Sequence, residues 1–352
     1  FIFFIFKGYF NKKDFNLDLR KNYRLNFKTR NLFENYIKNQ VFNEMPLTYL
    51  EKYDFIRKSI FDGNQKKQNI ITSTEHISDD YIKIWLAEKV FNKSSLYIYD
   101  HSNSFRLKMN DFNHEIHISK KIISSLKNKN NKFINLPELK FSLDYIKEKS
   151  NKNKTNKILS LILYEGPKYS GKLISSPSGP TNNFQFNHML RFYLGLKKKI
   201  QKEIKFKAPP YTKLRFDSLS KLINLVGIEK VYKPNDSLKK IIMNSKILVC
   251  TYPQTTFLEI LLSERPFIIL LPKRFWSFDK NNQKILDKLV RKKIAFYDEK
   301  KASQHLNKNW EKINEWWNSK KIKLVRRNIV EENFNFNIDH DKGWERFFNK
   351  VI

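Results

Sequence analysis

The sequence predicts an α/β protein built from two domains with parallel sheets. Its 352 residues exceed the usual size of one small domain and suit two domains of ordinary size. Short apolar runs alternate with amphipathic stretches of helical spacing along most of the chain. Strands separated by helices in this way form βαβ units, whose strands are parallel. We predict a first domain at 1–148, a linker at 149–157, a second domain at 158–303 and a helical tail at 304–352.

The first domain shows this alternation in its central part. Residues 31–41 have helical spacing, and Asn69–Thr72 has the composition of a short strand. A helix is predicted at Asp80–Phe91, with Asp80 at its start, and Ser95–Tyr99 is the next strand. Ligands of parallel sheets bind at the loops that follow the carboxyl ends of the strands. The polar residues after these two strands are therefore candidates for a site.

The second domain repeats the alternation more regularly, after a linker that lacks apolar residues at 150–156. This regularity predicts a doubly wound, Rossmann-like domain. In chain order, its predicted strands are Ile158–Tyr164, Lys205–Ala208, Glu229–Tyr232, Lys246–Thr251, Pro266–Leu271 and Ile294–Tyr297. Its predicted helices are Asn183–Ile200, Asp236–Met243, Thr255–Leu262 and Asn282–Arg291.

The charge of the chain is strongly basic. Lys and Arg number 68 against 35 Asp and Glu, which gives a net charge of +33. Such a balance is typical of proteins that bind nucleic acid or an anionic membrane surface. However, Asn, Lys, Ile and Phe are abundant throughout, and these residues have A/T-rich codons, so compositional drift also explains the charge. No nucleic-acid-binding motif is present and the lysines are spread out, so a nucleic acid is not an expected partner, although a basic nucleic-acid-binding protein stays the alternative class.

The cysteine content and the hydropathy predict a cytoplasmic protein. The single cysteine, Cys250, lies next to the apolar run Ile247–Val249, so we predict a buried thiol and a reducing compartment. No apolar stretch reaches the ~18–20 residues that span a bilayer. The run Phe1–Phe6 is predicted to be a buried strand, since it lacks the features of a signal peptide. Because the chain begins with Phe, we expect it to be a fragment without its natural N-terminus.

The strongest local signal for chemistry lies at 248–271. A buried strand leads into a turn rich in hydroxyl and amide groups, and the next helix presents free N–H groups and the positive end of its dipole. Thr255 or Thr256 can cap this helix, and Gln254 precedes it. Glu259, one turn further on, can accept hydrogen bonds from sugar hydroxyls. The alternative is an ordinary turn in which the threonines are caps and Glu259 pairs with a cation.

This stretch resembles the donor-binding half of GT-B glycosyltransferases and of teichoic-acid-type glycerophosphotransferases. There, a strand, a Ser/Thr-rich turn, a helix bearing Glu and a small loop before Pro hold a nucleotide-activated donor. More closely, the chain resembles a family of transferases linked to bacterial surface-carbohydrate biosynthesis. The resemblance extends from about residue 45 to 335, and the matching segments are Met45–Leu50, Ile71–Ser73, Tyr99–His101, Thr255–Glu259 and Trp316–Trp317.

The resemblance implies a GT-B-like architecture, in which two Rossmann-like domains with parallel sheets face a central cleft and a C-terminal helix crosses back. It implies transfer of a sugar or sugar-like group from a nucleotide-activated donor to a surface-glycan or lipid-linked acceptor, without a metal or other cofactor. The family's Gln-His-Gly-Gly is replaced here by Asp100–Asn103. A non-catalytic, glycan-binding relative is therefore a second alternative.

The loop that begins at Glu165 is the second candidate for donor binding. Its Gly166…Gly171-Lys172 spacing fits a P-loop, but Leu173 replaces the required Ser or Thr and Pro167 removes one N–H. The resemblance implies instead a loop that contacts the phosphates of the donor, with Gly166 in it. A leaving diphosphate needs cations nearby, and the candidates are Lys172, Arg191 and Arg215.

Acidic and imidazole groups follow the two strands of the first domain. Glu75 and His76 come after the first strand and His101 after the second, and one of them would act as general base on an acceptor hydroxyl. For each, a purely local hydrogen bond is the alternative. The run His114–His117 (HEIH) lacks the spacing that puts two histidines on one helical face, so no metal is expected there.

The helical tail is rich in tryptophan and in basic residues. We expect Trp310, Trp316 and Trp317 to pack in the core at the domain junction. The basic residues at 320–327 would suit an anionic lipid surface, so a peripheral contact with the inner membrane is an expected interaction of the protein.

Overall fold

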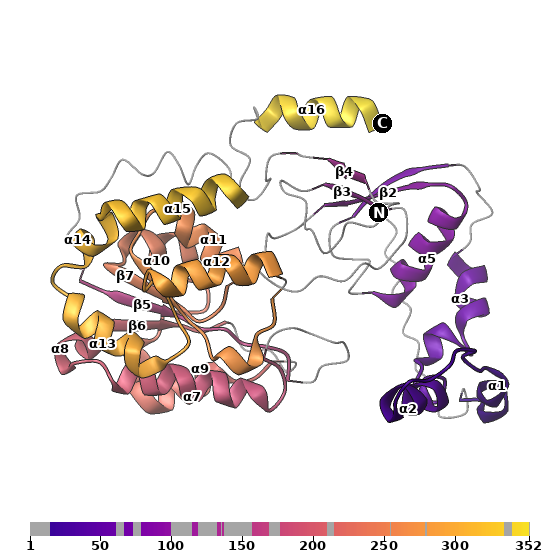
Figure 1. The fold of residues 1–352 in the computed structure, drawn as a ribbon, viewed down its shortest axis with the longest axis horizontal. Helices are drawn as coiled ribbons and strands as arrows, with labels where there is room; N and C mark the ends of the chain where they lie inside the picture. The colour runs from indigo at the N-terminus through magenta and orange to yellow at the C-terminus, as the bar shows by residue number, and fades with distance from the viewer. Residues whose placement is uncertain are drawn as a thin grey trace. The chain divides into compact units, whose positions relative to one another are not determined.

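The computed structural model describes residues 15–60, 67–72, 79–99, 115–118, 132–134, 136, 157–168, 177–209, 215–253, 255–278, 280–333 and 340–351 (Figure 1). The chain divides into two compact units. The first comprises Phe1–Tyr99 and Asp111–Ile116, and the second comprises Asp100–Asn110 and His117–Ile352. The predicted strand Phe1–Phe6 and residues 149–156 of the predicted linker lie outside the described residues, so these predictions stay open.

The first unit opens with short helices: α1 (Leu17–Asn22), α2 (Leu32–Gln40), the 3-10 helix η2 (Leu47–Tyr49) and α3 (Tyr53–Ile60). A buried ion pair fastens them together. The guanidinium of Arg20, 2% exposed, donates to Glu51 Oε1 at 2.6 Å and Oε2 at 2.8 Å. It also donates to the carbonyls of Phe42 and Asn43. A buried charge is tolerated only with such complete pairing, so this cluster fixes the start of the unit.

A four-stranded sheet contains the βαβ unit predicted for the first domain. Strands β1 (Asn69–Thr72) and β2 (Ser95–Tyr99) are parallel, and helix α5 (Asp80–Phe91) connects them. Strands β3 (Glu115–Ile118) and β4 (Lys132–Ile134) follow in the order β1-β2-β3-β4. The cap of α5 is Asp79, whose side chain accepts from the Ile82 N–H at 3.0 Å, so the cap lies one residue before the predicted Asp80.

The described part of the second unit is centred on a five-stranded parallel sheet. Its strands are β5 (Leu159–Ile162), β6 (Ile204–Lys207), β7 (Ile247–Cys250), β8 (Phe267–Leu270) and β9 (Ala295–Phe296). Their order, β6-β5-β7-β8-β9, is a doubly wound order. Strands β7, β8 and β9 are apolar throughout because both faces of such a sheet are covered. The predicted α/β class with parallel sheets is confirmed.

Helices cover both faces of this sheet (Figure 1). One face packs against α10 (Leu238–Asn244), α11 (Thr255–Leu262) and α12 (Lys280–Arg291). The other face packs against α7 (Thr181–Leu194), α8 (Lys198–Lys202) and α9 (Ser218–Val226). Side chains of β7 alternate between the two cores, since Leu248 belongs to the first and Val249 to the second. Cys250 is fully buried, and burial raises the pKa of its thiol to about 12, so the predicted buried thiol is confirmed.

Two predictions in this unit are wrong. The strand expected at Glu229–Tyr232 is the 3-10 helix η5 (Ile228–Lys230), after which Val231 forms only an isolated bridge to Phe206. The helix expected at Asn183–Ile200 is two helices, because α7 ends at Leu194, with Gly195 as its C-cap, and α8 starts at Lys198. A Cβ at position 195 would lie 2.6 Å from Ser303 Oγ, so glycine lets the end of α7 approach this side chain closely.

The tail contributes to both cores. It forms α13 (Glu299–Asn309), α14 (Ile313–Asn318), α15 (Lys320–Asn333) and α16 (His340–Val351). Trp310 is 6% exposed and packs in the core between the sheet and α7. Trp317 is 1% exposed and packs in the core between the sheet and α11. The predicted core role is confirmed for these two tryptophans, but the core is that of the second unit itself.

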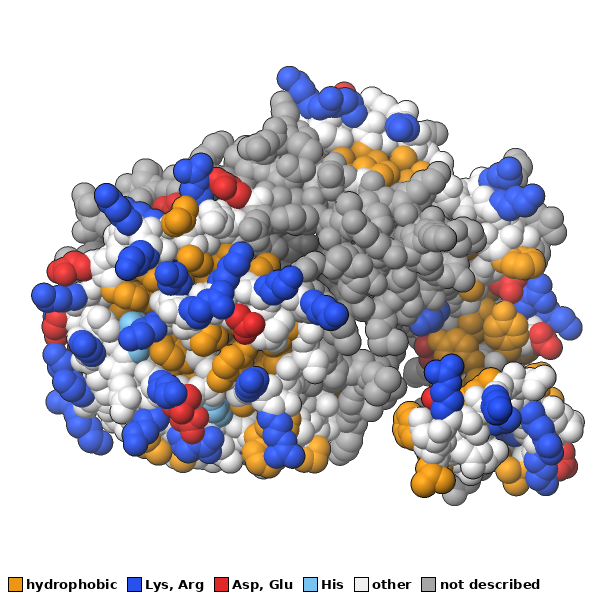
Figure 2. Space-filling view, viewed as in Figure 1, with side chains coloured by type: hydrophobic (Ala, Val, Ile, Leu, Met, Phe, Trp, Pro, Cys, Tyr) orange, Lys and Arg blue, Asp and Glu red, His pale blue; other side chains and the backbone are white. Residues whose placement is uncertain are grey.

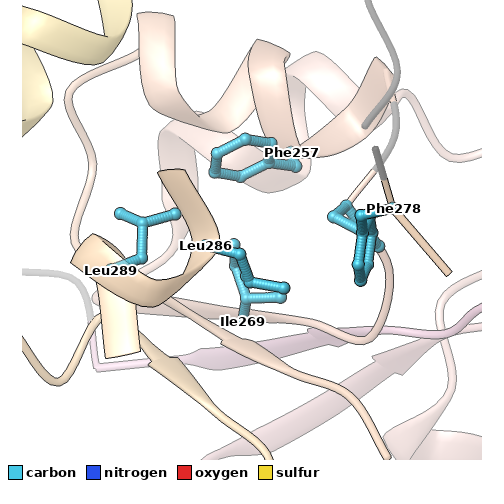
Figure 3. A pocket seen from close by; sticks show the side chains of 6 residues that line it. Phe257, Ile269, Phe278, Leu286 and Leu289 are labelled. Carbon is cyan, nitrogen blue, oxygen red and sulfur yellow. The ribbon is translucent and has the colours of Figure 1, made fainter. Parts of the chain in front are cut away.

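An apolar gap lies within the core between α11, β8 and α12 (Figure 3). Its lining includes Phe257, Ile269, Leu286 and Leu289. The gap has no room for a water molecule and no polar lining, so it is part of the packed interior and not a ligand site.

A buried imidazole in the tail predicts loss of stability in acid. Burial, together with the charge of Lys293, lowers the pKa of His305 to about 4. Between pH 6.5 and 4 the unfolded chain binds a proton that the folded chain excludes, so stability falls as the pH falls through this window. The full shift corresponds to about 3 kcal/mol, and partial exposure of the ring reduces the expected loss to about 2 kcal/mol.

Urea unfolding at pH 7 and pH 4.5 measures this loss. In His305→Phe the ring contacts with Phe296 and Trp316 are retained without the titrating group. We expect the variant to lose less stability than the wild type between these two pH values. An equal loss in both proteins would assign the acid sensitivity to other groups.

Candidate functional site

The candidate site lies at the carboxyl edge of the sheet in the second unit, where β5 and β7 are neighbours. The chain leaves β5 toward α7, whose Phe186 packs on one face, and leaves β7 toward α11, whose Phe257 packs on the other. Adjacent strands whose connections diverge in this way form the switch point of a doubly wound sheet, where ligands bind.

Thr251, directly after β7, is hydrogen-bonded to the end of β5 and to the loop that follows it. Its hydroxyl accepts from the Tyr164 N–H at 2.6 Å and donates to the Ile162 carbonyl at 3.2 Å. The side-chain amide of Gln185 donates to the Thr251 carbonyl at 2.8 Å and accepts from the Trp276 indole at 3.3 Å. These polar groups are satisfied within the chain, so Thr251 fixes the geometry of the edge.

The start of α11 brings two predicted residues together. Thr256 Oγ1 shares a hydrogen bond of 2.7 Å with the hydroxyl of Tyr252, and Glu259 is 8% exposed one turn later. Burial raises the pKa of Tyr252, and the charge of Glu259 adds to this shift. A carboxylate near a helix N-terminus is stabilised by the dipole. Thr255 is the first residue of α11, and Gln254 lies outside the described residues.

The loop after β5 is tied to the start of α7. The Gly166 N–H donates to Asn182 Oδ1 at 2.9 Å, and Asn182 Nδ2 donates to the carbonyls of Pro167 and Gly179. The hydroxyl of Tyr164 donates to the Pro177 carbonyl at 3.0 Å. The Gly166 N–H is therefore engaged inside the protein. The predicted contact of this loop with donor phosphates stays a prediction, and Lys172 lies outside the described residues.

Arg215 stands beside this loop, as a predicted cation should. Its backbone forms an antiparallel bridge with Pro167, and its side chain is exposed. Its charge acts on two groups of the edge, since it lowers the pKa of both Glu165 and Tyr252, although burial raises each pKa more strongly. The structure thus brings Arg215, Thr256 and Glu259 to one edge of the sheet.

Arg191 lies elsewhere on α7. It is in the last turn of this helix and pairs with Glu299 at the start of α13. Glu299 also lies 3.1 Å from His188 Nε2. This ion pair fastens α7 to α13, so Arg191 has a structural partner, and its role toward a diphosphate stays a prediction.

Glu165 is a residue that the sequence analysis did not single out as a ligand. It follows the apolar strand β5, is 8% exposed, and accepts from the Ser218 N–H at 2.9 Å through Oε1. A carboxylate that follows a buried, mostly apolar strand of a parallel sheet is the signal that could have identified it.

The predicted general bases Glu75, His76 and His101 lie outside the described residues, so their roles stay predictions. Within the described ranges, no group of three metal-binding side chains is close enough to hold an ion.

None of the described helices combines the length and the apolar character that crossing a bilayer requires. Figure 2 shows that Lys and Arg side chains are spread over the visible face of the second unit and not gathered in one stripe.

A doubly wound sheet with buried carboxylates and hydroxyls at its carboxyl edge defines the chain as an α/β protein of the class that binds ligands at this edge. The chain belongs to the LIC12162 family of transferases, whose profile matches residues 5–348. The resemblance to a transferase family is confirmed. A comparison with curated proteins finds no match.

Among solved structures, Anabaena Alr3699/HepE in complex with UDP and glucose is similar at 10% identity and a TM-score of 0.47, over 84% of this chain and 81% of that one. A candidate UDP-N-acetylglucosamine 2-epimerase from Listeria monocytogenes has 10% identity and a TM-score of 0.46, over 86% and 84%. The wall teichoic acid polymerase TagF, soaked with CDPG, has 8% identity and a TM-score of 0.34, over 82% and 90%. At this level of similarity, no residue role or ligand is carried over to this chain.

Proposed function

We propose that this transferase moves a sugar or sugar-like group from a nucleotide-activated donor to a surface-glycan or lipid-linked acceptor. The observation that carries the proposal is the buried carboxylate of Glu259 on the first turns of α11, at the switch point of the sheet. A buried carboxylate there accepts hydrogen bonds from hydroxyls of a donor, while the N-terminal N–H groups of the same helix suit its phosphates.

The reaction needs a general base and a group that stabilises the leaving anion. A base drawn from Glu75, His76 and His101 takes the proton of the acceptor hydroxyl. The acceptor oxygen then forms a bond to the transferred group as the bond to the nucleotide breaks, and the nucleotide leaves as an anion. Arg215 stabilises this developing negative charge from the edge of the sheet. Catalysis in the cytoplasm without a metal ion is part of the proposal.

Nucleotide binding tests the donor site. Isothermal titration with UDP, CDP, GDP, ADP and the corresponding nucleotide sugars is expected to give micromolar binding for one nucleotide class. Glu259→Gln is expected to weaken this binding by about 10-fold or more, because a hydrogen bond to a charged acceptor contributes about 1.5–3 kcal/mol. Glu315→Gln, an exposed position on α14, is the matched control and should bind like the wild type.

Two outcomes contradict this assignment. The donor proposal fails if none of these compounds binds the wild-type protein. The role of Glu259 fails if a nucleotide binds equally well to Glu259→Gln and to the wild type. Turnover of any bound donor would dismiss the alternative of a non-catalytic glycan-binding protein.

A further inference from the structure

Helix α2 of the first unit exposes an apolar face. Residues four apart lie on one side of a helix, so Leu32 is beside Tyr36 and Phe33 is beside Ile37. These four side chains, which we call the α2 face, are 88%, 60%, 70% and 37% exposed in that order. None of the nine residues of α2 is buried. A contiguous apolar surface of this kind marks a place of contact with a protein or a membrane.

Hydrogen bonds, rather than a buried apolar stripe, hold α2 in the first unit. The Asn31 side chain accepts from the Glu34 N–H at 2.9 Å, and the Glu34 carboxylate accepts from the Arg30 N–H at 2.7 Å. Near the other end, Lys38 Nζ donates to the Phe27 carbonyl at 2.8 Å. A helix this short is marginal in water unless its apolar side packs against something. A partner that covers the α2 face would therefore stabilise it.

The chain just before α2 enlarges this apolar surface. Of the 17 exposed large apolar side chains among the described residues, eight lie between positions 15 and 37. The four outside the α2 face are Phe15, Leu17, Tyr23 and Phe27. Figure 2 shows hydrophobic and basic side chains interspersed on the visible face of the part that contains α1 and α2. The partner is therefore expected to meet apolar and positive groups together.

Three exposed cations accompany the α2 face, namely Arg24, Lys28 and Arg30. No described carboxylate forms an ion pair with any of them, because the acidic groups nearby have other partners. Asp18 pairs with Lys21 at 3.4 Å, and the Glu34 carboxylate is bound at the start of α2. Leu, Phe and Tyr beside Lys and Arg is the composition of surfaces that lie in the interface of a membrane, and anionic lipids attract such cations.

Charge decides between a membrane and a second copy of the chain. Two copies that met through this surface would bring their cations together, and each chain carries a net charge of +33. An anionic bilayer instead complements both the apolar and the positive groups. We propose that the α2 face, with Arg24, Lys28 and Arg30, is a docking surface for an anionic lipid bilayer. The proposal goes beyond the proposed function, because binding to lipid needs no nucleotide.

The basic tail, which the sequence favoured for this contact, offers less apolar surface. In α15, Ile322 and Arg326 are buried, and Arg326 lies over the ring of Trp317. Arg327 pairs with Glu331 at 2.6 Å. The exposed large apolar side chain of α15 is Leu324, at 60%. The tail therefore supplies charge with one apolar group, whereas the first unit supplies charge with a whole apolar face.

Vesicle cosedimentation of the full chain tests the docking surface. The vesicles are phosphatidylcholine alone and phosphatidylcholine with about one third phosphatidylglycerol. We expect binding to the anionic vesicles, and binding to phosphatidylcholine alone to be weaker by about 10-fold or more. Leu32→Gln/Phe33→Gln should weaken binding to the anionic vesicles by about 10-fold or more, because two apolar side chains no longer leave water. Lys28→Gln/Arg30→Gln should weaken it by about 10-fold and reduce its dependence on salt.

The tail provides matched controls for both kinds of substitution. Leu324→Gln changes an exposed leucine beside basic residues, and Lys320→Gln/Lys321→Gln removes two exposed charges. Both should bind the anionic vesicles within about 2-fold of the wild type. Equal weakening in the tail and α2 variants would assign binding to the overall charge and overturn the proposal. Weakening in the tail variants alone, or no binding of the wild type to the anionic vesicles, would overturn it as well.

A fluorescent label shows whether the α2 face itself enters the bilayer. Cys250 is fully buried, so an environment-sensitive dye can be attached selectively to Phe33→Cys or to Asn35→Cys. Asn35 is exposed and lies two residues further on, away from the α2 face. Anionic vesicles are expected to shift the emission of the dye at position 33 to shorter wavelength and to leave that at position 35 nearly unchanged. Equal shifts at the two positions, or no shift at either, would contradict insertion of this face.

Measurements without lipid test the other partners that could cover the face. Sedimentation velocity should give the same mass for the wild type and for Leu32→Gln/Phe33→Gln. A wild-type dimer that this variant dissociates would assign the face to a second copy and overturn the proposal. The urea midpoint of the variant should equal that of the wild type, because α2 contains no buried residue. A lower midpoint with unchanged vesicle binding would assign the face to another segment of the chain and overturn it too.

Discussion

Gly166→Ala is expected to destabilise the second unit by about 3 kcal/mol and to abolish nucleotide binding. A Cβ at this position would lie well inside contact distance of the Pro177 carbonyl oxygen and 2.9 Å from Asn182 Oδ1. The first of these atoms is backbone, so the clash is relieved only by moving the loop off the start of α7. The hydrogen bonds that tie the loop to Asn182 would be lost with it.

Urea unfolding and isothermal titration measure the two effects. Gly195→Ala is the comparison, because the Cβ added there would meet Ser303 Oγ at 2.6 Å, the end of a side chain that can rotate. Its expected cost is below about 1.5 kcal/mol, and nucleotide binding should persist. If the two variants were equally stable, the close packing around Gly166 would not hold the loop.

Trp317→Ala is expected to destabilise the second unit by about 4 kcal/mol, within the range for truncation of a large buried aromatic residue. The indole is 1% exposed and meets the ring of Phe267 edge-on, with centroids 5.0 Å apart. Its N–H donates to the Glu264 carbonyl at 2.7 Å, and the guanidinium of Arg326 lies 4.2 Å from the ring centroid. The substitution leaves a cavity, an open carbonyl and a guanidinium without its aromatic partner.

Denaturant unfolding followed by circular dichroism measures this loss. Trp316→Ala is the matched control, because the neighbouring indole is only partly buried, and it should cost less than half as much. Trp317→Phe should recover part of the stability by filling the cavity without restoring the hydrogen bond. A cost below about 1 kcal/mol for Trp317→Ala would mean that the tail is not part of this core.

The strands of the second unit could be predicted because burial on both faces leaves a simple signature. Runs such as Ile247–Cys250 and Phe267–Leu270 are apolar throughout, and nothing but a central parallel strand or a buried helix segment has this composition. Glu229–Tyr232 misled the prediction because a short β-branched and aromatic run has the same composition in a 3-10 turn as in an edge strand. Pairing, which decides between them, depends on distant residues.

The candidate site was only partly predictable for a similar reason. Thr256 and Glu259 lie on a helix that starts directly after a strand, so local spacing was enough to bring them to the edge of the sheet. Glu165 and Ser218 are 53 residues apart in the chain, and their contact depends on how α9 packs beside the loop after β5. The ion pair between Arg191 and Glu299 could not be predicted either, because the two residues are 108 positions apart in the chain.

The tail gives the second unit a property that a Rossmann-like sheet alone does not have. Leu306 and Ile313 pack in the core on one face of the sheet, and Trp317 and Ile322 pack in the core on the other face. A single stretch of chain therefore covers the sheet on both faces. Local unfolding of the core on one face of the sheet would therefore disturb the core on the other face. The unit should therefore melt in one cooperative step, and amides of β7 and of α13 should exchange with solvent at similar rates. This packing on both faces should keep the carboxyl edge of the sheet rigid. Ligand binding is therefore expected to change the conformation of the loops while leaving the sheet unchanged.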